Sequence, residues 1–401
     1  MSIKFVQLGE VTTLQAGIGF PLNLQGRKNG LFPFAKVGDI SRCGRTGNSI
    51  LTTADHYVDQ VDVDSLRAKP VPVGSILFAK IGEAIRQNHR VVTGCRMLID
   101  NNAMAAIPGE KINGRFLYHF LKTVDFYCLA PATTVPALRK SDLERLPIPL
   151  PPLTAQRRIA VILDQADALR AKRREALAQL DSLTQSIFIE MFGDPVSNPK
   201  DWPRVRFATL LENIDSGWSP VCMDHAAQDD EWGVLKLGAV TSCTYNDSEN
   251  KALPEGVAFD PKIEVKPGDL LFSRKNTYHL VAACVLVGES RERLMLSDLI
   301  FRFRLNSDSK VEKQYLQSLL VFPSKRSEVQ KLAGGSSGSM PNISKGRLLE
   351  LDIELPPLSV QQIYSARIQS IDALKATHRT SLTELDSLFA SLQHRAFRGE
   401  L

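Results

Sequence analysis

The sequence predicts two similar globular domains, each followed by a long helix, with the two helices paired antiparallel as a coiled coil. The first observation behind this prediction is a repeat with a period of about 200 residues, because Leu146–Leu153 (LPIPLPPL) recurs as Leu351–Leu358 (LDIELPPL). The second is a helix-forming stretch after each copy, and the third is the spacing of apolar residues within it. The period is too long for a solenoid, so each copy is interpreted as a domain plus a helix.

Anchor residues continue the repeat on either side of this motif. Gln156 falls on Gln361, and Gly74–Phe78 matches Gly268–Phe272. Between such anchors the two copies differ in almost every residue. The pattern predicts two heads that share a scaffold and bind related but non-identical targets.

Length and composition are typical of a globular, multidomain protein. A length of 401 residues gives roughly two to three domains, and the repeat makes two the natural number. No apolar run is long enough to cross a membrane, and Met1–Gln7 lacks the long apolar stretch and cleavage site of a signal peptide. Six scattered cysteines without a C-x-x-C pair indicate reduced thiols in a cytoplasmic protein. The net charge of +5 is compatible with binding to nucleic acid.

The first long helix is predicted from Thr154 to Phe192. The stretch is rich in strong helix formers, Thr154 supplies an N-cap hydroxyl, and Gly193 stops the helix. About 39 residues at 1.5 Å each give a rod of roughly 58 Å. Apolar steps of three and four predict a coiled-coil seam, with Arg173 as its polar step, through Ile159, Ile162, Ala166, Leu169, Ala176, Leu180, Leu183 and Ile187.

The second helix carries the same register in a weaker seam, with His378 where the first has Arg173. This seam runs through Tyr364, Arg367, Ile371, Leu374, His378, Ser381, Leu385, Leu388 and Leu392. Two interpretations compete: each helix packs on its own domain, or the two helices pair with each other. We favour antiparallel pairing, because a narrow seam requires a partner of similar length and the chain contains one. Leu180, Leu183, Leu385 and Leu388 are then expected to be buried between the helices.

The chain resembles the specificity (S) subunit of a type I restriction–modification system. The resemblance is carried by Leu150–Ile159 (LPPLTAQRRI), by its echo Leu355–Ile363 (LPPLSVQQI) and by Phe192–Pro203. It implies two α/β (α+β) target recognition domains separated by two long antiparallel helices in a pseudo-twofold repeat. It also implies double-stranded DNA, modification (methyltransferase) subunits and restriction subunits as partners.

The expected domain boundaries follow from the repeat and the helices. They are target recognition domains at 1–153 and 204–358, spacer helices at 154–193 and 359–397, and a linker at 194–203.

The predicted function is that of a non-catalytic DNA-recognition subunit. Each head would read one half of a bipartite site, and partner subunits docked on the helices would supply methylation and cleavage. The sequence has no Asn/Asp-Pro-Pro-Tyr/Phe run, no G-x-x-x-x-G-K-[ST] loop and no histidine spacing typical of metal ligands, so no catalytic residue, cofactor or metal is expected. The alternative is a helical scaffold that organises proteins without reading sequence.

Polar and basic residues gather after the two matched Gly-x-[Ile/Leu]-Leu-Phe strands. In the first head they are Lys80, Arg86, Asn88, His89 and Arg90, and in the second Arg274, Lys275, Asn276 and Tyr278. Side chains of Arg, Lys and Asn read base edges through hydrogen bonds. The matched loops are therefore predicted to contact the two half-sites, and the alternative is that they are solvated loops.

A second set of candidates lies in the turn before each long helix. Arg139 and Lys140 in the first copy, and Lys345 in the second, would contact phosphates or are ordinary surface residues. The basic cluster Arg170–Arg174 on the first helix is either solvated or faces the DNA duplex or an acidic partner.

Overall fold

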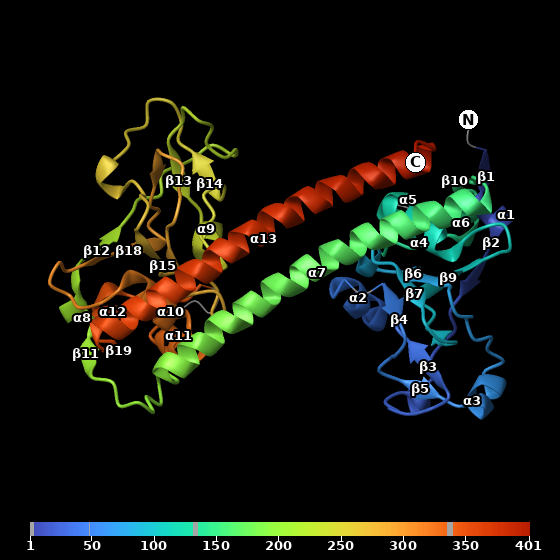
Figure 1. The fold of residues 1–401 in the computed structure, drawn as a ribbon, viewed down its shortest axis with the longest axis horizontal. Helices are drawn as coiled ribbons and strands as arrows, with labels where there is room; N and C mark the ends of the chain where they lie inside the picture. Colours follow the sequence, from blue (N-terminus) through green and yellow to red (C-terminus); the bar gives the residue numbers. More distant parts are fainter. Residues whose placement is uncertain (1–3, 48, 131–134, 335–339) are drawn as a thin grey trace. The chain divides into compact units, whose positions relative to one another are not determined.

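Both long helices are shared between two structural units. The computed structural model describes residues 4–47, 49–130, 135–334 and 340–401 (Figure 1). Unit 1 comprises Met1–Ala176 and His378–Leu401, and unit 2 comprises Leu177–Thr377. The unit boundaries fall inside α7 (Leu153–Phe192) and α13 (Leu358–Arg398). Each unit therefore holds half of each helix and one head: head 1 lies before α7, and head 2 lies between α7 and α13.

Head 1 is built on a five-stranded sheet with the order β2-β9-β6-β7-β4. A three-stranded sheet has the order β5-β3-β8, and β1 pairs with β10. The strands are β1 (Phe5–Gln7), β2 (Thr12–Ala16), β3 (Phe32–Ala35), β4 (Ile50–Leu51), β5 (Tyr57–Val58), β6 (Ile76–Ala79), β7 (Val91–Thr93), β8 (Leu98–Ile99), β9 (Ala103–Pro108) and β10 (Pro147–Pro149). The helices are α1 (Leu8–Val11), α2 (Val37–Arg45), α3 (Gln60–Ser65), α4 (Gly114–Thr123), α5 (Phe126–Leu129) and α6 (Lys140–Glu144), with short 3-10 turns at Leu22–Leu24 and Glu83–Ile85.

Head 2 is built on a four-stranded sheet with the order β12-β18-β15-β16. A three-stranded sheet has the order β14-β13-β17, and β11 pairs with β19. The strands are β11 (Arg204–Arg206), β12 (Leu211–Ser216), β13 (Gly233–Leu235), β14 (Asn250–Ala252), β15 (Leu270–Ser273), β16 (Cys284–Leu286), β17 (Leu294–Met295), β18 (Ile300–Leu305) and β19 (Asp352–Glu354). The helices are α8 (Phe207–Leu210), α9 (Gly238–Thr241), α10 (Lys313–Val321), α11 (Pro323–Lys331) and α12 (Lys345–Leu349), with a 3-10 turn at Pro261–Ile263.

The two heads repeat one topology. In head 1 strand β9 runs antiparallel to both β2 and β6, and in head 2 β18 runs antiparallel to both β12 and β15. The parallel pair β3–β8 recurs as β13–β17. This mixture of helices and strands confirms the predicted α/β class and the internal repeat.

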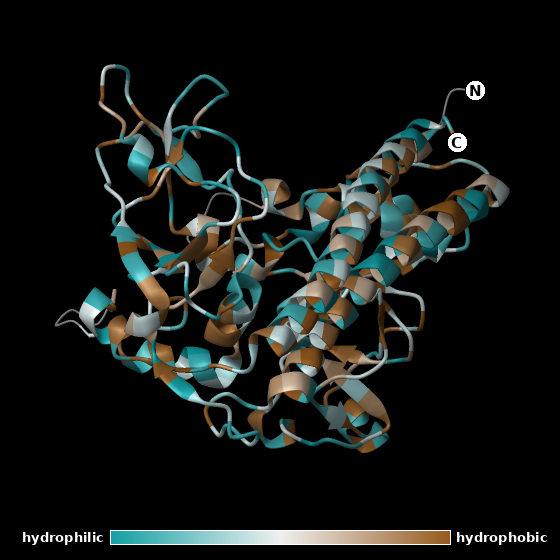
Figure 2. Ribbon diagram, turned by 60° about the vertical axis from the view of Figure 1, so that its left-hand side comes forward, coloured by the Kyte–Doolittle hydropathy of each residue, from teal (hydrophilic) through white to brown (hydrophobic). Residues whose placement is uncertain are grey.

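The recurring Gly-x-[Ile/Leu]-Leu-Phe motif marks the buried strand of each sheet. Every residue of β6 and of β15 is buried, so both faces of these strands lie in the interior. A strand covered on both faces is expected to show a continuous apolar run rather than alternation, and these strands do so. Figure 2 shows such apolar segments in brown.

A buried glutamine fixes the start of each long helix to its head. The Gln156 side chain accepts a hydrogen bond from the backbone of Asn113 (2.8 Å) and donates to the carbonyls of Lys111 (3.2 Å) and Pro151 (2.8 Å). Gln361 repeats all three bonds, with the backbone groups of Glu312 (2.9 Å), Lys310 (3.1 Å) and Pro356 (2.7 Å). Both side chains are fully buried. The repeat therefore preserves a structural clamp, which explains the matched glutamines.

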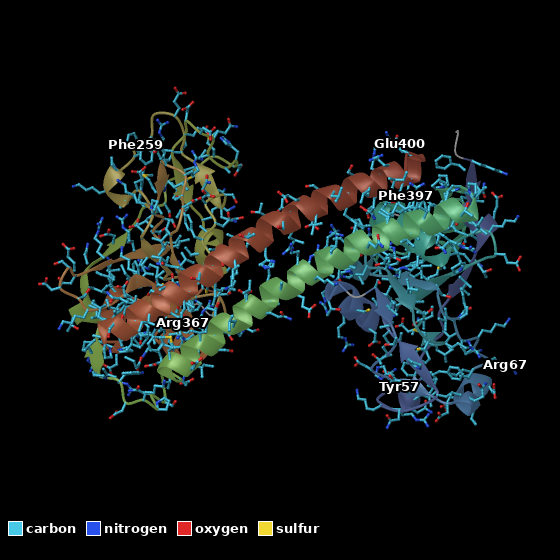
Figure 3. All side chains as sticks on the ribbon, viewed as in Figure 1. Tyr57, Arg67, Phe259, Arg367, Phe397 and Glu400 are labelled. Carbon is cyan, nitrogen blue, oxygen red and sulfur yellow. The ribbon has the colours of Figure 1, made fainter. Side chains whose placement is uncertain are left out.

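Each head packs against the start of one helix and the end of the other. In unit 1 the core includes Ile159 and Leu163 of α7 together with Phe389 of α13. Phe397, labelled near the end of α13 in Figure 3, lies 5.3 Å from the Phe116 ring. The core of unit 2 contains the matching segments, Phe188 and Phe192 of α7 with Tyr364, Ile368 and Ile371 of α13. The ends of the helices thus belong to the cores of the heads.

The middle parts of the helices pair through polar side chains. In unit 1 Arg170 of α7 donates to Asp386 of α13 (2.5 Å), and Arg173 is 2.9 Å from His378. In unit 2 Lys375 of α13 contacts Asp181 of α7 at 2.8 Å. The first half of α7 therefore meets the second half of α13, and the reverse holds in unit 2, so the halves run antiparallel as predicted. Arg170 is engaged inside the protein rather than left to a solvated basic patch.

The seam prediction holds at one position of each heptad and only in part at the other. The seven-residue series is buried or half-buried: Ile159, Ala166, Arg173, Leu180 and Ile187, with Tyr364, Ile371, His378, Leu385 and Leu392. Three residues further on, Leu169, Leu183, Leu374 and Leu388 are 53%, 45%, 52% and 52% exposed, and Arg367 (Figure 3) is also exposed. The covered residues lie four positions on instead: Leu163, Arg170, Leu177 and Thr184, with Ile368, Lys375, Leu382 and Phe389. Some of these covered residues are polar. A seam predicted from apolar residues alone therefore misses them and picks the leucine one position earlier. Ile162, Ala176 and Ser381, at this same predicted position, are half-buried.

A charged cluster joins α4 to α7 in unit 1. The Arg115 guanidinium donates to both carboxylate oxygens of Asp164 (3.0 Å each), and His119 Nε2 lies 2.7 Å from the same carboxylate. Burial favours the neutral acid, but hydrogen bonds from His119 and Arg115 outweigh it and lower the pKa of Asp164 to about 2. His119 is fully buried, and burial lowers its pKa despite the attraction of Asp164.

Candidate nucleic-acid interface

Loops gather at one edge of the head 1 sheet. Because β2 and β6 both run antiparallel to β9, their ends lie at the same edge as the start of β9. Lys80, which follows β6, donates its backbone N–H to Asn102 (2.7 Å) and accepts from Leu138 (2.9 Å). A bridge between Ile81 and Ala137 continues this contact. The loop predicted around Lys80 and the turn predicted around Lys140 are therefore neighbours.

Head 2 forms the same edge with the same backbone contacts. Arg274 follows β15, donates its N–H to Leu299 (3.1 Å) and accepts from Ile343 (2.8 Å). Lys275 bridges Asn342 as Ile81 bridges Ala137. We call the segments that meet in each head the loop edge: they start at Gly17, Lys80, Asp100 and Ala137 in head 1, and at Gly217, Arg274, Ser297 and Asn342 in head 2.

Two predicted cations of head 2 share one aromatic ring. The Arg274 guanidinium lies 4.7 Å from the centroid of the Phe301 ring, and the Lys345 ammonium lies 5.7 Å from it. Arg274 Nε also donates to the side-chain oxygen of Asn342 (3.0 Å), and Lys345 Nζ donates to the carbonyl of Ile214 (2.5 Å). Arg274 is thus held by an aromatic face and an amide while it remains partly exposed.

Sequence reasoning did not identify Phe301 and Asn342 as part of this arrangement. Asn342 lies in the turn that ends at Lys345. Its position in the repeat could have identified it as a candidate from the sequence. Phe301 is the second residue of strand β18, and nothing in its apolar surroundings distinguishes it from a core residue.

Arg86 is exposed on head 1 and already has partners. It forms an ion pair with Glu83 (2.5 Å), and its guanidinium donates to the Tyr127 hydroxyl (2.6 Å) while lying 4.1 Å from the centre of that ring. Both ends of the ion pair are more than half exposed, so it contributes little to stability. A phosphate or base edge could replace Glu83 as the acceptor.

Arg90 is buried and Asn88 is half-buried in head 1, so the contact that both were predicted to make with DNA stays a prediction that their surroundings do not support. Arg90 is 5% exposed and lies 3.6 Å from the centre of the Phe126 ring, and burial lowers its pKa to about 9. It donates to the side-chain oxygen of Asn88 (2.6 Å). The Asn88 amide donates in turn to the carbonyl of Val124 (3.1 Å). These two side chains connect the loop to α5 from inside the head.

The other predicted residues divide by exposure. Asn276 is 7% exposed and its side-chain amide donates to Thr241 (3.3 Å), so its predicted contact with DNA also stays a prediction that its surroundings do not support. His89 is half-buried, and burial is the main cause that lowers its pKa. Lys80 and Lys275 are half-buried, whereas Arg139, Lys140 and Tyr278 are exposed, and Lys140 lies 3.6 Å from Glu144. The exposed residues and the half-buried cations remain candidates for DNA contact.

A groove lies between the two helices in unit 1. Its volume is about 550 Å³, and its lining includes Leu169 and Leu388, with polar groups from Lys172 and Glu384. The equivalent leucines of unit 2, Leu374 and Leu183, are also exposed. A single exposed leucine needs no explanation, but the repeat places a matched pair in each unit.

The described residues offer neither a metal site nor a membrane span. Within the described ranges, no group of three or more His, Cys, Asp or Glu side chains is arranged to hold a metal ion. No helix in the described part of the chain has the length and apolar character of a membrane span.

Comparison with a family model matches most of the chain. The model describes the type I restriction modification DNA specificity domain, and it matches residues 2–179 and 236–387. One matched region lies in each copy of the internal repeat.

Two relatives show how the similarity is distributed. The type I restriction enzyme EcoEI specificity subunit of Escherichia coli is 36% identical over 168 residues, which is 42% of this chain and 28% of that protein. The EcoKI specificity subunit of Escherichia coli strain K12 is 23% identical over 320 residues, or 73% of this chain and 67% of that protein. The stronger similarity is thus confined to a smaller part of the chain.

Two solved structures share the fold. The S subunit of a type I restriction–modification system from M. genitalium superimposes with a TM-score of 0.60 at 13% identity, over 98% of this chain and 96% of that chain. A chain from a structure that concerns complex assembly and conformational transition of the type I R-M system gives a TM-score of 0.54 at 19% identity, over 100% of this chain and 98% of that one. At these identities the likeness establishes the fold.

Proposed function

This chain belongs to the type I restriction modification DNA specificity family, and on that premise we propose that its two heads contact the two halves of a bipartite DNA site. Family membership confirms the resemblance expected from the Pro-Pro-Leu-x-x-Gln repeat and makes the chain a specificity subunit. The alternative of a helical scaffold without sequence readout is not favoured by this membership.

The observation that carries the proposal is the matched loop edge with different side chains. Backbone contacts at Lys80 in head 1 and Arg274 in head 2 are equivalent, so the scaffold presents both loops in the same way. The residues that follow differ, with Arg86 exposed in head 1 and Tyr278 exposed in head 2. One scaffold with two sets of exposed polar groups fits the readout of two different half-sites.

Within head 2 the two cations are suited to different roles. The partly exposed fork of Arg274 is oriented by Asn342 and Phe301, and a fixed guanidinium fork matches the two acceptors of guanine in the major groove. Lys345 uses one of its three donors on the carbonyl of Ile214 and keeps others for a phosphate oxygen. We therefore assign base readout to Arg274 and backbone positioning to Lys345.

The helices are the proposed docking surface for modification subunits. Leu169 and Leu388 in unit 1, and Leu183 and Leu374 in unit 2, offer apolar contacts with a polar rim, the composition of a protein interface. Because the repeat supplies the surface twice, we propose two modification subunits on one specificity subunit. Methylation and cleavage would come from the modification and restriction subunits, and we propose the cytoplasm as the site of action.

The test is to map the DNA that the complex recognises. The protein is purified with its modification subunits, incubated with a randomised DNA library, and the methylated sequences are read. The proposal predicts one asymmetric motif of two specific parts separated by a non-specific spacer of fixed length. Methylation with a single uninterrupted motif, or with no motif, would contradict it.

A further inference from the structure

We propose that a two-residue turn, before β9 in head 1 and before β18 in head 2, is a specificity-determining segment, with Asn101 reading one half-site and Asp298 the other. The inference rests on the proposed function and adds residues that the sequence patterns did not indicate. It starts from the topology, because each turn leads directly into β9 or β18 at the loop edge.

The two turns are structurally equivalent. In head 1 the N–H of Ala103 donates to the carbonyl of Asp100 (3.0 Å), and in head 2 the N–H of Ile300 donates to that of Ser297 (3.3 Å). Asn101 and Asp298 therefore occupy the same corner position, and both are exposed. The next residue of each turn accepts the hydrogen bond from Lys80 or Arg274, so the corner lies beside the proposed reading loop.

A second loop covers the other side of each turn. The segment after β2 approaches so closely at Gly17 that a Cβ atom there would lie 1.8 Å from the carbonyl oxygen of Asp100. Gly217 makes a similar approach one residue before the turn, where a Cβ atom would lie 1.9 Å from the carbonyl oxygen of Leu296. In head 2 the Ser219 hydroxyl also donates to the Asp298 carboxylate. The corner residue therefore lies between two loops, the one that follows β2 or β12 and the one that follows β6 or β15.

The first residue of each turn carries an unusual feature. Asp100 Oδ1 and Ser297 Oγ are buried, and neither has a hydrogen-bond partner among the described residues. Asp100 is 7% exposed and Ser297 is 3% exposed. An unsatisfied buried oxygen costs free energy, so its recurrence at one turn position in both heads indicates a segment maintained for a purpose other than stability.

The chemistry of the corner residues favours base contact over phosphate contact. A position that contacts phosphate would not carry a carboxylate, because two anions repel. A carboxylate on a DNA-facing edge is suited to a base donor, and Asp accepts a hydrogen bond from the N4 amino group of cytosine. An asparagine at the equivalent position pairs with N6 and N7 of adenine. The two heads therefore differ at this corner in the base that they select.

The experiment exchanges the two side chains. Asn101→Asp and Asp298→Asn are each purified as the full chain with modification subunits, and the methylated sequences from a randomised library are compared with those of the unchanged protein. Controls at the far end of the same strands are Glu110→Gln and Asp308→Asn, both exposed. Asn101→Ala serves if Asn101→Asp does not yield folded protein.

Asn101→Asp is expected to shift one position of one half-site from adenine toward cytosine by roughly tenfold or more, with the other half unchanged. Asp298→Asn should produce the opposite shift in the other half, and the controls should produce none. If the variants methylate the same motif as the unchanged protein, or lose methylation uniformly over all sequences, the inference is overturned. The proposed function would still stand in that case, provided that the unchanged protein yields a bipartite motif. A library that yields no bipartite motif even with the unchanged protein would contradict the proposed function itself, and this inference with it.

Discussion

The four exposed leucines of the helices offer a quantitative test of how the protein assembles. We consider the double variants Leu169→Ser with Leu388→Ser in unit 1 and Leu183→Ser with Leu374→Ser in unit 2. Full burial of a leucine side chain contributes about 1.5–3 kcal/mol. These side chains are 45–53% exposed, so docking of a partner can add roughly half of that, about 1 kcal/mol each.

Each double variant is therefore expected to weaken binding of one modification subunit by about 2 kcal/mol, or roughly 30-fold in Kd. The stability of the isolated protein should change by less than about 1 kcal/mol per substitution, because exposed helix positions tolerate serine. Titration calorimetry with purified modification subunit measures the affinity, and urea unfolding measures the stability. Leu31→Ser, at a 64% exposed leucine of head 1, is the matched control.

Unchanged affinity in both double variants would refute the reasoning that these leucines form the docking surface. A large loss of stability in the isolated protein would also refute it, since it would show that the leucines support the helices instead.

Two further predictions concern the framework of the heads. Gln361→Leu should lower the free energy of unfolding by roughly 2–5 kcal/mol, because it leaves the buried carbonyl of Pro356 and the part-buried backbone groups of Glu312 and Lys310 without this partner. Urea unfolding compares it with Gln362→Leu at the adjacent exposed position, and an equal effect of both would contradict the clamp. His119 has a lowered pKa in the folded state, so the unfolded chain binds more protons below about pH 6.5 and stability should fall as the pH drops from 7.5 to 5. His119→Gln should reduce that fall in thermal unfolding experiments, and an unaltered pH dependence would show that other groups dominate.

The two long helices show which features of the fold can be predicted from sequence patterns. The repeat and the absence of proline and glycine predict two long helices, and the helices begin at Leu153 and Leu358, one residue before the predicted starts. Thr154 therefore lies in the first turn rather than at the N-cap. The heptad series through Ile159 and Tyr364 is also predictable. The second seam position is not, because Arg170 and Lys375 enter the seam through ion pairs with a distant segment.

The loops of the candidate interface show which features cannot be predicted from the sequence. Repeat alignment predicts that Lys80 and Arg274 start equivalent loops, and the structure agrees. It cannot predict that Arg90 lies inside head 1, because the aromatic ring that covers it, Phe126, comes from a helix formed more than thirty residues later. A basic residue in a polar stretch is indistinguishable by type from one that packs on an aromatic ring. Contacts distant in sequence decide between the two environments.

The most direct test of the central claim compares one altered residue in each head. The methylated sequences of a randomised library are read for Arg274→Ala and, separately, for Arg86→Ala, each in complex with modification subunits. We predict that Arg274→Ala relaxes base preference in one half of the motif by about 1–3 kcal/mol and leaves the other half unchanged, while Arg86→Ala alters only the opposite half. A change in both halves from either variant, or a uniform loss over all sequences, would contradict the claim that each head reads its own half-site.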